Sequence, residues 1–256
     1  MTTEWLVAIS GLLGLTVGSF LNVCIYRLPL DQSLAFPASH CTSCNRQLRW
    51  FENVPVLAWT LLRGRCRTCH ASISFVYPLV ELFTGVMFAL AAWHYGPGVL
   101  LVSRLLLGCM LIVLFFIDLR HRILPNVITV GGTVVGFIFS FVTPPGWLSS
   151  LIGLVIGGLM PYLLAKAYFR IRKIEGLGMG DVKMLALIGA FLGWQLVLLT
   201  LALASVLGSL VGLGLILTRR GDMKLALPFG TFLAIAAMVA AAAGDPIVGW
   251  YMGFYR

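Results

Sequence analysis

Residues 178–217 read GMGDVKMLALIGAFLGWQLVLLTLALASVLGSLVGLGLIL, and this stretch decides the fold class. Beyond Asp181 it is almost wholly apolar, and similar runs of roughly 20 apolar residues, each long enough to span a bilayer, recur along the chain. Only 11% of the 256 residues are charged, whereas a soluble domain carries about 25%. The sequence therefore predicts an all-α polytopic membrane protein.

The apolar runs predict about eight transmembrane helices. They lie near residues 5–26, 78–94, 99–117, 127–142, 148–167, 182–193, 196–217 and 229–243. We expect the first to be a retained span, because it has too little N-terminal positive charge for a signal peptide. Small residues at helical spacing predict close helix packing in the first and fifth spans; they are Gly11, Gly14, Gly18, Gly153, Gly157 and Gly158.

Positive charge is distributed unevenly among the turns that join these spans. Arginine and lysine gather in the odd-numbered turns, so the positive-inside rule places those turns in the cytoplasm and both termini on the outer side. The residues are Arg27, Arg46, Arg49, Arg63, Arg65, Arg67, Arg120, Arg122, Lys166, Arg170, Arg172, Lys173, Lys183, Arg219, Arg220 and Lys224. Tryptophans near the opposite face fit an interfacial belt. The net charge of +9 thus reflects topology, and we expect no nucleic-acid partner.

The span that follows Asp181 is unusually short. Val182 to Gly193 gives about twelve residues, or roughly 18 Å of helix, against a hydrocarbon core about 30 Å thick. Either the bilayer thins locally, or the helix begins below the cytoplasmic surface and carries Asp181 into the membrane, where a water-filled cavity would reach it. Flexible glycines at positions 176, 178 and 180 would permit such an irregular entry.

Two aspartates are the candidate reaction centre. Asp118 ends an apolar run before a basic turn, and Asp181 precedes an apolar helix, so both are predicted at cytoplasmic helix ends. Two close carboxyl groups readily share one proton, and such a pair can activate water against a peptide bond. Two structural explanations stay open. Asp181 would serve as a helix N-cap, and Asp118 as a solvated acid paired with Arg120 or Arg122.

Four cysteines in the polar segment 27–77 form two C-x-x-C knuckles. The pairs Cys41/Cys44 and Cys66/Cys69 are separated by about twenty residues, which is typical of a tetrahedral zinc ribbon. Four thiolates leave no open coordination position, so the zinc would be structural. It would stabilise a segment that is too small to form a hydrophobic core of its own. Disulfides and redox-active thiols are the rival explanations, but disulfides are rare in the reducing cytoplasm.

Taken in order, the motifs resemble those of the type IV prepilin peptidases, a bacterial family of intramembrane aspartic proteases. The N-terminal part carries Gly18-Ser19-Phe20-Leu21-Asn22-Val23, the two cysteine knuckles, Glu52-Asn53-Val54-Pro55, Arg63-Gly64-Arg65-Cys66 and Tyr77-Pro78-Leu79-Val80-Glu81. The C-terminal part carries Asp118, Leu124-Pro125-Asn126 and the Gly-x-Gly-Asp motif ending at Asp181. The resemblance covers nearly the whole chain. One departure is Thr42, where many members have proline.

The resemblance implies two reactions. The first is cleavage of a short basic leader from type IV prepilins or type II secretion pseudopilins, after a glycine, at the cytoplasmic face of the bacterial inner membrane. The second, found in many members, is methylation of the new N-terminus, usually phenylalanine, by S-adenosylmethionine. The residues assigned by resemblance are Asp118 and Asp181 as catalytic groups, Gly178, Gly180 and Lys183 as motif support, and Gly64 and Arg65 for methyl transfer.

The expected organisation has three parts. These are a first transmembrane helix in residues 1–26, a cytoplasmic zinc-binding and methyltransferase-associated domain in 27–77, and an intramembrane aspartic peptidase domain in 78–256. Two other functions stay open. An ion-coupled transporter would use Glu81 with the two aspartates as a proton relay, and a membrane scaffold would dock a partner through the zinc ribbon. Glu81 also has a structural explanation, as a carboxylate favoured by a helix N-terminus.

Overall fold

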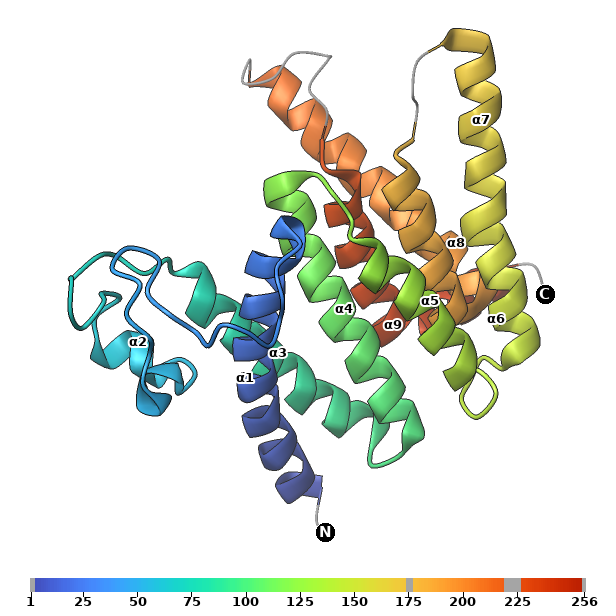
Figure 1. Cartoon of the computed structure of the whole chain (residues 1–256). Helices are drawn as coiled ribbons and strands as arrows, with labels where there is room; N and C mark the ends of the chain where they lie inside the picture. Colours follow the sequence, from blue (N-terminus) through green and yellow to red (C-terminus); the bar gives the residue numbers. More distant parts are fainter. Residues whose placement is uncertain (1–2, 174–176, 219–226, 255–256) are drawn as a thin grey trace. The chain divides into compact units, whose positions relative to one another are not determined.

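The structure, a computed structural model, describes residues 3–173, 177–218 and 227–254 (Figure 1). Over these residues the secondary structure is helical, with two isolated β-bridges and no strand. The predicted all-α class is therefore confirmed. The chain divides into two compact units, Met1–Leu105 and Leu106–Arg256. The division falls within α4, which spans Val99–His121.

Glycines allow two helices of the first unit to pack closely. α1 spans Thr3–Arg27 and α3 spans Val76–Tyr95, and the two lie side by side (Figure 1). A Cβ atom at Gly14 would lie 2.7 Å from the Cβ of Phe88, and one at Gly18 would lie 2.7 Å from the Cα of Glu81. Side chains larger than hydrogen would force the helices apart, so the predicted packing face of α1 is confirmed.

The polar segment between α1 and α3 contains only short helices. They are η1 (Leu28–Leu30), η2 (Trp50–Asn53) and α2 (Leu57–Leu61). Its start is organised by Arg27, whose buried guanidinium donates to the carbonyls of Ser33 at 2.9 Å and Pro37 at 2.6 Å. Arg27, which was predicted from its charge to lie at the cytoplasmic face, therefore also holds the loop that follows α1 in place.

The second unit is a helical bundle. Besides most of α4, it contains α5 (Asn126–Phe139), α6 (Trp147–Leu154), the π-helical turn η3 (Val155–Leu159), α7 (Met160–Arg172), α8 (Met179–Leu217) and α9 (Phe229–Gly253). Its core is formed by fully buried side chains such as Leu114 of α4, Ile188 of α8 and Leu233 of α9. This core fixes the end of α4 and the starts of α8 and α9, which carry the residues discussed below.

Within the described ranges, six helical segments are long and apolar enough to cross a membrane. They are Thr3–Leu30, Val76–Tyr95, Val99–His121, Trp147–Arg172, Met179–Leu217 and Phe229–Gly253. The shorter apolar helix α5 adds a seventh segment. Because α8 comprises two helical parts joined at a bend, these segments correspond to the eight predicted spans.

The bend in α8 lies at Gly193, where φ is 79° and ψ is −179°. A Cβ atom there would also lie 2.5 Å from the Ser149 hydroxyl oxygen and 2.6 Å from Pro145 Cγ, so both backbone and space require glycine. The predicted short span, which ended at Gly193, thus matches the first part of α8. The predicted packing face of the fifth span is also confirmed, because a Cβ atom at Gly153 would lie 2.5 Å from the Gly189 carbonyl oxygen.

Candidate active site and metal centre

The carboxyl group of Asp118 is buried and bound to the start of α9. Asp118 lies in the last turn of α4, and 5% of its surface is exposed. Its Oδ2 accepts hydrogen bonds from the backbone N–H of Thr231 at 2.8 Å and from the Thr231 hydroxyl at 3.1 Å. Asp118 is therefore not a solvated acid at an interface. Arg122 lies close enough for its charge to act on the carboxyl group, and its backbone N–H donates to the Asp118 carbonyl at 2.9 Å.

Asp181 lies in the first turn of α8 and is partly buried. The N-cap of this helix is Gly178, whose carbonyl accepts the Asp181 backbone N–H at 3.1 Å. The N-cap explanation for Asp181 is therefore wrong. Asp118 and Asp181 belong to the same unit, and they are close enough for the charge of Asp118 to act on Asp181.

Leu124 joins the two helix starts that flank these acids. A Cβ atom at Gly180 would lie 3.1 Å from the Cβ of Leu124, and one at Gly230 would lie 3.1 Å from its Cδ1. The same Gly230 position lies 3.0 Å from Asp118 Oδ2. The Leu124 side chain thus packs against the first turn of α8 and the first turn of α9, beside both aspartates.

Lys183 makes a second link between these segments. Its Nζ donates to Oδ1 of Asn126 at 2.8 Å, and Asn126 is the first residue of α5. The segment between α4 and α5 is therefore held at Leu124 by packing and at Asn126 by a hydrogen bond. Lys183 supports the position of the motif without a described contact to either carboxyl group.

The glycines before Asp181 provide space and not an unusual backbone. Gly178 has φ −65° and ψ 138°, which any residue can adopt, and Gly180 is helical. A Cβ atom at Gly178 would lie 3.0 Å from Asp181 Oδ2. The expectation that these two glycines give a flexible entry to the helix is therefore wrong, and Gly176 lies outside the described residues.

The sulfur atoms of Cys41, Cys44, Cys66 and Cys69 lie within 4.8 Å of one another. Those of Cys41 and Cys69 are 3.8 Å apart. A tetrahedral site with Zn–S bonds of about 2.3 Å places its sulfurs about 3.8 Å apart, whereas a disulfide bond measures about 2.05 Å. The arrangement therefore fits a four-thiolate zinc site and not a disulfide.

Backbone N–H groups stabilise thiolates at the first cysteine of each knuckle. The N–H of Cys44 lowers the pKa of Cys41, and the N–H of Cys69 lowers the pKa of Cys66 to about 6. Although the Ala71 N–H opposes the change, desolvation and the neighbouring sulfurs raise the pKa of Cys69 to about 11. The close thiols therefore do not all ionise together when no cation is present. A bound cation would displace their remaining protons.

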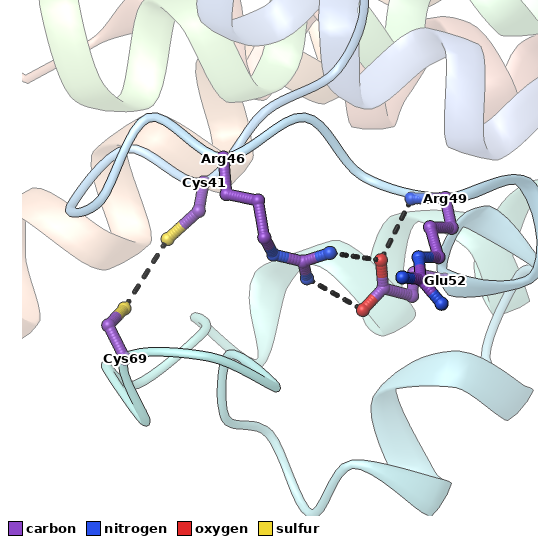
Figure 2. A network of polar contacts seen from close by, with 5 residues as sticks. All are labelled: Cys41, Arg46, Arg49, Glu52 and Cys69. Atoms are coloured by element: carbon purple, nitrogen blue, oxygen red, sulfur yellow. Dashed lines mark hydrogen bonds and ion pairs between the residues drawn. The ribbon is translucent and has the colours of Figure 1, made fainter.

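An ion pair braces the first knuckle. The guanidinium of Arg46 donates to both oxygens of Glu52, at 3.0 and 2.7 Å, and the backbone N–H of Arg49 donates to Oε2 at 2.8 Å (Figure 2). The Glu52 side chain is only 2% exposed. The hydrogen bonds from Arg46 lower the pKa of Glu52 to about 2.

Comparison with known proteins assigns the chain to a family. A model described as the bacterial peptidase A24 N-terminal domain matches residues 12–95, and a model described as the type IV leader peptidase family matches residues 105–213. The chain belongs to the type IV leader peptidase family. No solved structure matches it.

Named relatives cover nearly all of the chain. A prepilin leader peptidase/N-methyltransferase of Pseudomonas putida is 38% identical over 96% of this chain and 94% of its own length. One of Aeromonas hydrophila is 38% identical over 94% of this chain and 92% of its length. A third, of Myxococcus xanthus, is 43% identical over 80% of this chain and 62% of its length. Membership in this family gives no support to a transporter or a scaffold.

Glu81 ends the stretch Tyr77-Pro78-Leu79-Val80-Glu81, and its contacts hold the polar segment. Its Oε2 accepts the Val56 backbone N–H at 2.7 Å. Val56 has φ 61° and ψ −48°, and the Leu57 N–H donates to the Pro55 carbonyl across it, which defines a γ-turn. A positive φ is rare for a β-branched residue. Glu81 lies in the second turn of α3, whereas the helix dipole acts mainly on groups in the first turn. Its hydrogen bond to Val56 therefore explains it better, as an anchor for the γ-turn.

The methyl-transfer candidates have different surroundings. Gly64 has φ 66°, and a Cβ atom there would lie 2.8 Å from Cζ2 of Trp59, so the local fold itself requires glycine. The Arg65 side chain is exposed beside the second knuckle. Arg65 is therefore available to a ligand, whereas Gly64 has a structural explanation of its own.

Sequence reasoning missed Thr231, the direct partner of Asp118. The last span was predicted near residues 229–243, with no role for its first residues. The family match ends at residue 213, before α9. A hydroxyl residue at the third position of an apolar helix was the available signal, because the first amides of a helix lack partners within it.

Proposed function

We propose that this member of the type IV leader peptidase family cleaves the leader peptide of type IV prepilins or type II secretion pseudopilins, with Asp118 and Asp181 as its catalytic groups. The observation that carries the proposal is the placement of a buried Asp118 near Asp181 in one helical unit. The names of the relatives support the substrate class and both reactions.

The chemistry needs one ionised and one protonated carboxyl group. The ionised group takes a proton from water, whose oxygen bonds to the scissile carbonyl carbon, while the protonated group gives its proton to the carbonyl oxygen. When the tetrahedral intermediate breaks, the C–N bond is lost and the first group gives its proton to the amine. The second group recovers a proton as the new carboxyl forms, which returns the pair to its starting state.

The proposed location is the cytoplasmic face of the bacterial inner membrane, with both termini on the outer side and lipid around the helices. The basic turns support this orientation, although the turn containing Arg219, Arg220 and Lys224 lies outside the described residues. The first part of α8 is too short for a full crossing, which supports a site sunk below the surface. Such a site would meet the leader junction without extracting the apolar pilin helix.

The second proposed reaction is N-methylation of the new N-terminus. The unprotonated amine nitrogen would bond to the methyl carbon of S-adenosylmethionine as the carbon–sulfur bond of its sulfonium breaks. S-adenosylhomocysteine would leave, and the methylated amine would release one proton to water. We assign the donor to the surface of the polar segment 27–77 that carries Arg65, because the bilayer core poorly accommodates a large polar cation. A structural zinc ion on Cys41, Cys44, Cys66 and Cys69 would hold this segment in shape.

The test is incubation of the purified protein with a prepilin and S-adenosylmethionine, followed by mass measurement of the products. Wild type should release the leader and add one methyl group. Asp118→Asn and Asp181→Asn keep the shape but cannot cycle a proton, so each should lose cleavage by at least about 10²-fold. Asp245→Asn, at an exposed acid of α9, is the control and should retain cleavage. Normal cleavage by either catalytic-site variant would overturn the aspartyl assignment.

A further inference from the structure

The two proposed catalytic acids are held in unequal surroundings. Asp118 Oδ2 accepts two hydrogen bonds from one residue, the backbone N–H and the hydroxyl of Thr231. Asp181 is near the backbone of Gly178 and the charge of Asp118. Hydrogen bonds donated to a carboxylate favour its ionised form, so these contacts distinguish the two groups.

Thr231 belongs to the start of α9. Pro228 is the N-cap of this helix, so Thr231 is its third residue and its N–H is one of the donors that have no partner within the helix. Asp118 of α4 supplies the missing acceptor. A negative charge is stabilised at a helix N-terminus, which adds to the effect of the two hydrogen bonds.

The surroundings of Thr231 leave it little freedom. Its surface is 6% exposed. The neighbouring Gly230 leaves room for the carboxyl group, because a Cβ atom there would lie 3.0 Å from Asp118 Oδ2. Among the residues that the structure describes, the charged groups near Asp118 are Asp181 of α8 and Arg122, which follows the end of α4. Thr231 therefore bonds one defined oxygen of Asp118, and the other oxygen, Oδ1, is the one assigned to the substrate water.

We infer that Asp118 is the ionised member of the pair and accepts the proton from water, that Asp181 carries the shared proton to the scissile carbonyl, and that Thr231 is the positioning residue that sets this division. The inference rests on the proposed peptidase function. Two close carboxyl groups do not both ionise readily, so the one with the stronger donors keeps the charge. The first step then runs from water to Asp118 and from Asp181 to the carbonyl oxygen.

The experiment is the pH profile of kcat/KM for leader cleavage by Thr231→Val in the full-length protein. Valine keeps the branched shape and the backbone N–H but removes the hydroxyl donor. Asp118 should then hold its proton to higher pH. Because Asp118 must be ionised to act as the base, the acidic limb should move up by about one pH unit. At a pH on the acidic side of both profiles, kcat/KM of Thr231→Val should be about tenfold lower than that of wild type.

Two control variants separate this effect from a general loss of structure. Thr231→Ser retains the hydroxyl and should keep the wild-type profile. Thr200→Val removes another buried hydroxyl, which donates to the Leu196 carbonyl of its own helix, and it should not move either limb. If Thr231→Val has too little activity for a profile, normal cleavage by Thr231→Ser would still support the inference, and its equal loss would overturn it.

The opposite assignment predicts a different result. If Asp118 were the proton donor, Thr231→Val would move the basic limb to higher pH and leave the acidic limb in place. That outcome, or an unchanged profile, would refute the inference while leaving the peptidase intact. Cleavage that survives in Asp118→Asn would instead refute the proposed function itself, so the two failures are distinguishable.

Discussion

Gly230→Ala should impair cleavage without unfolding the protein. The added methyl group would lie 3.0 Å from Asp118 Oδ2, and 3.1 Å from both Asp118 Cγ and Leu124 Cδ1. Ordinary van der Waals contact begins at about 3.4 Å, so the neighbours must move by a few tenths of an ångström. Leu124 also packs against Gly180, one residue before Asp181. The carboxyl group is therefore the neighbour expected to shift.

The size of the effect follows from this displacement. A misplacement of 1 Å can cost about 10²-fold in rate. If the activation free energy rises in proportion to the displacement, a shift of a few tenths of an ångström costs about 1 kcal/mol. This corresponds to a loss of about fivefold in kcat. Alanine is favoured over glycine within a helix by roughly 0.5–1 kcal/mol. This gain offsets the packing conflict, so the variant should stay folded.

The assay is the initial rate of leader release by purified wild type and Gly230→Ala. Zinc content and membrane insertion serve as folding checks. Gly208→Ala is the matched control, because its Cβ atom would make an ordinary contact, 3.5 Å from Phe232 Cδ2. We expect kcat to fall in Gly230→Ala alone, with KM little changed. A wild-type kcat in Gly230→Ala, alongside an inactive Asp118→Asn, would refute the argument that the carboxylate position is fixed by close packing.

Three further predictions concern the polar segment. Wild type should hold one zinc ion per chain, and Cys66→Ser should release it and expose residues 27–77 to proteolysis; reduced wild-type protein without metal would contradict this. The stability added by the Arg46–Glu52 pair is fully present above the ordinary Glu pKa of 4.5 and is lost as the pH falls towards about 2. The difference in proteolytic stability between wild type and Glu52→Gln should therefore shrink over that range, and a constant difference would contradict it. Gly64→Ala should lower both methylation and zinc retention because it displaces Trp59. Arg65→Ala should lower methylation alone. If either variant lost cleavage to the same extent as methylation, the segment would instead be a structural support for the peptidase.

The parts of the fold that the sequence predicted depend on local properties. Apolar length indicated the spans, including the short one that ends at Gly193, where the structure has the bend in α8. The four cysteines were also predictable, since each knuckle is closed within a few residues. The Cys41 N–H donates to the Arg46 carbonyl and the Cys66 N–H to the Ala71 carbonyl, so spacing alone encodes most of the geometry.

The contacts that sequence did not predict join distant parts of the chain. Thr231 and Asp118 are 113 residues apart, and Glu81 and Val56 are 25 apart. Each pair depends on which helices are neighbours, and hydropathy carries no information about that choice. Composition could identify the scarce acids as notable, because buried charge is costly. It could not identify the donor that would satisfy each of them.

The glycines before Asp181 were identified correctly from the sequence as important, but the reason given for them was wrong. The sequence suggested that Gly178 and Gly180 give flexibility before Asp181, yet both have backbone angles open to other residues. They are small because Asp181 and Leu124 occupy the space where their side chains would lie. The aspartate is therefore held by a packed helix start. A catalytic group on such an element is placed more accurately than one on a loop, as two carboxyl groups that share one proton require.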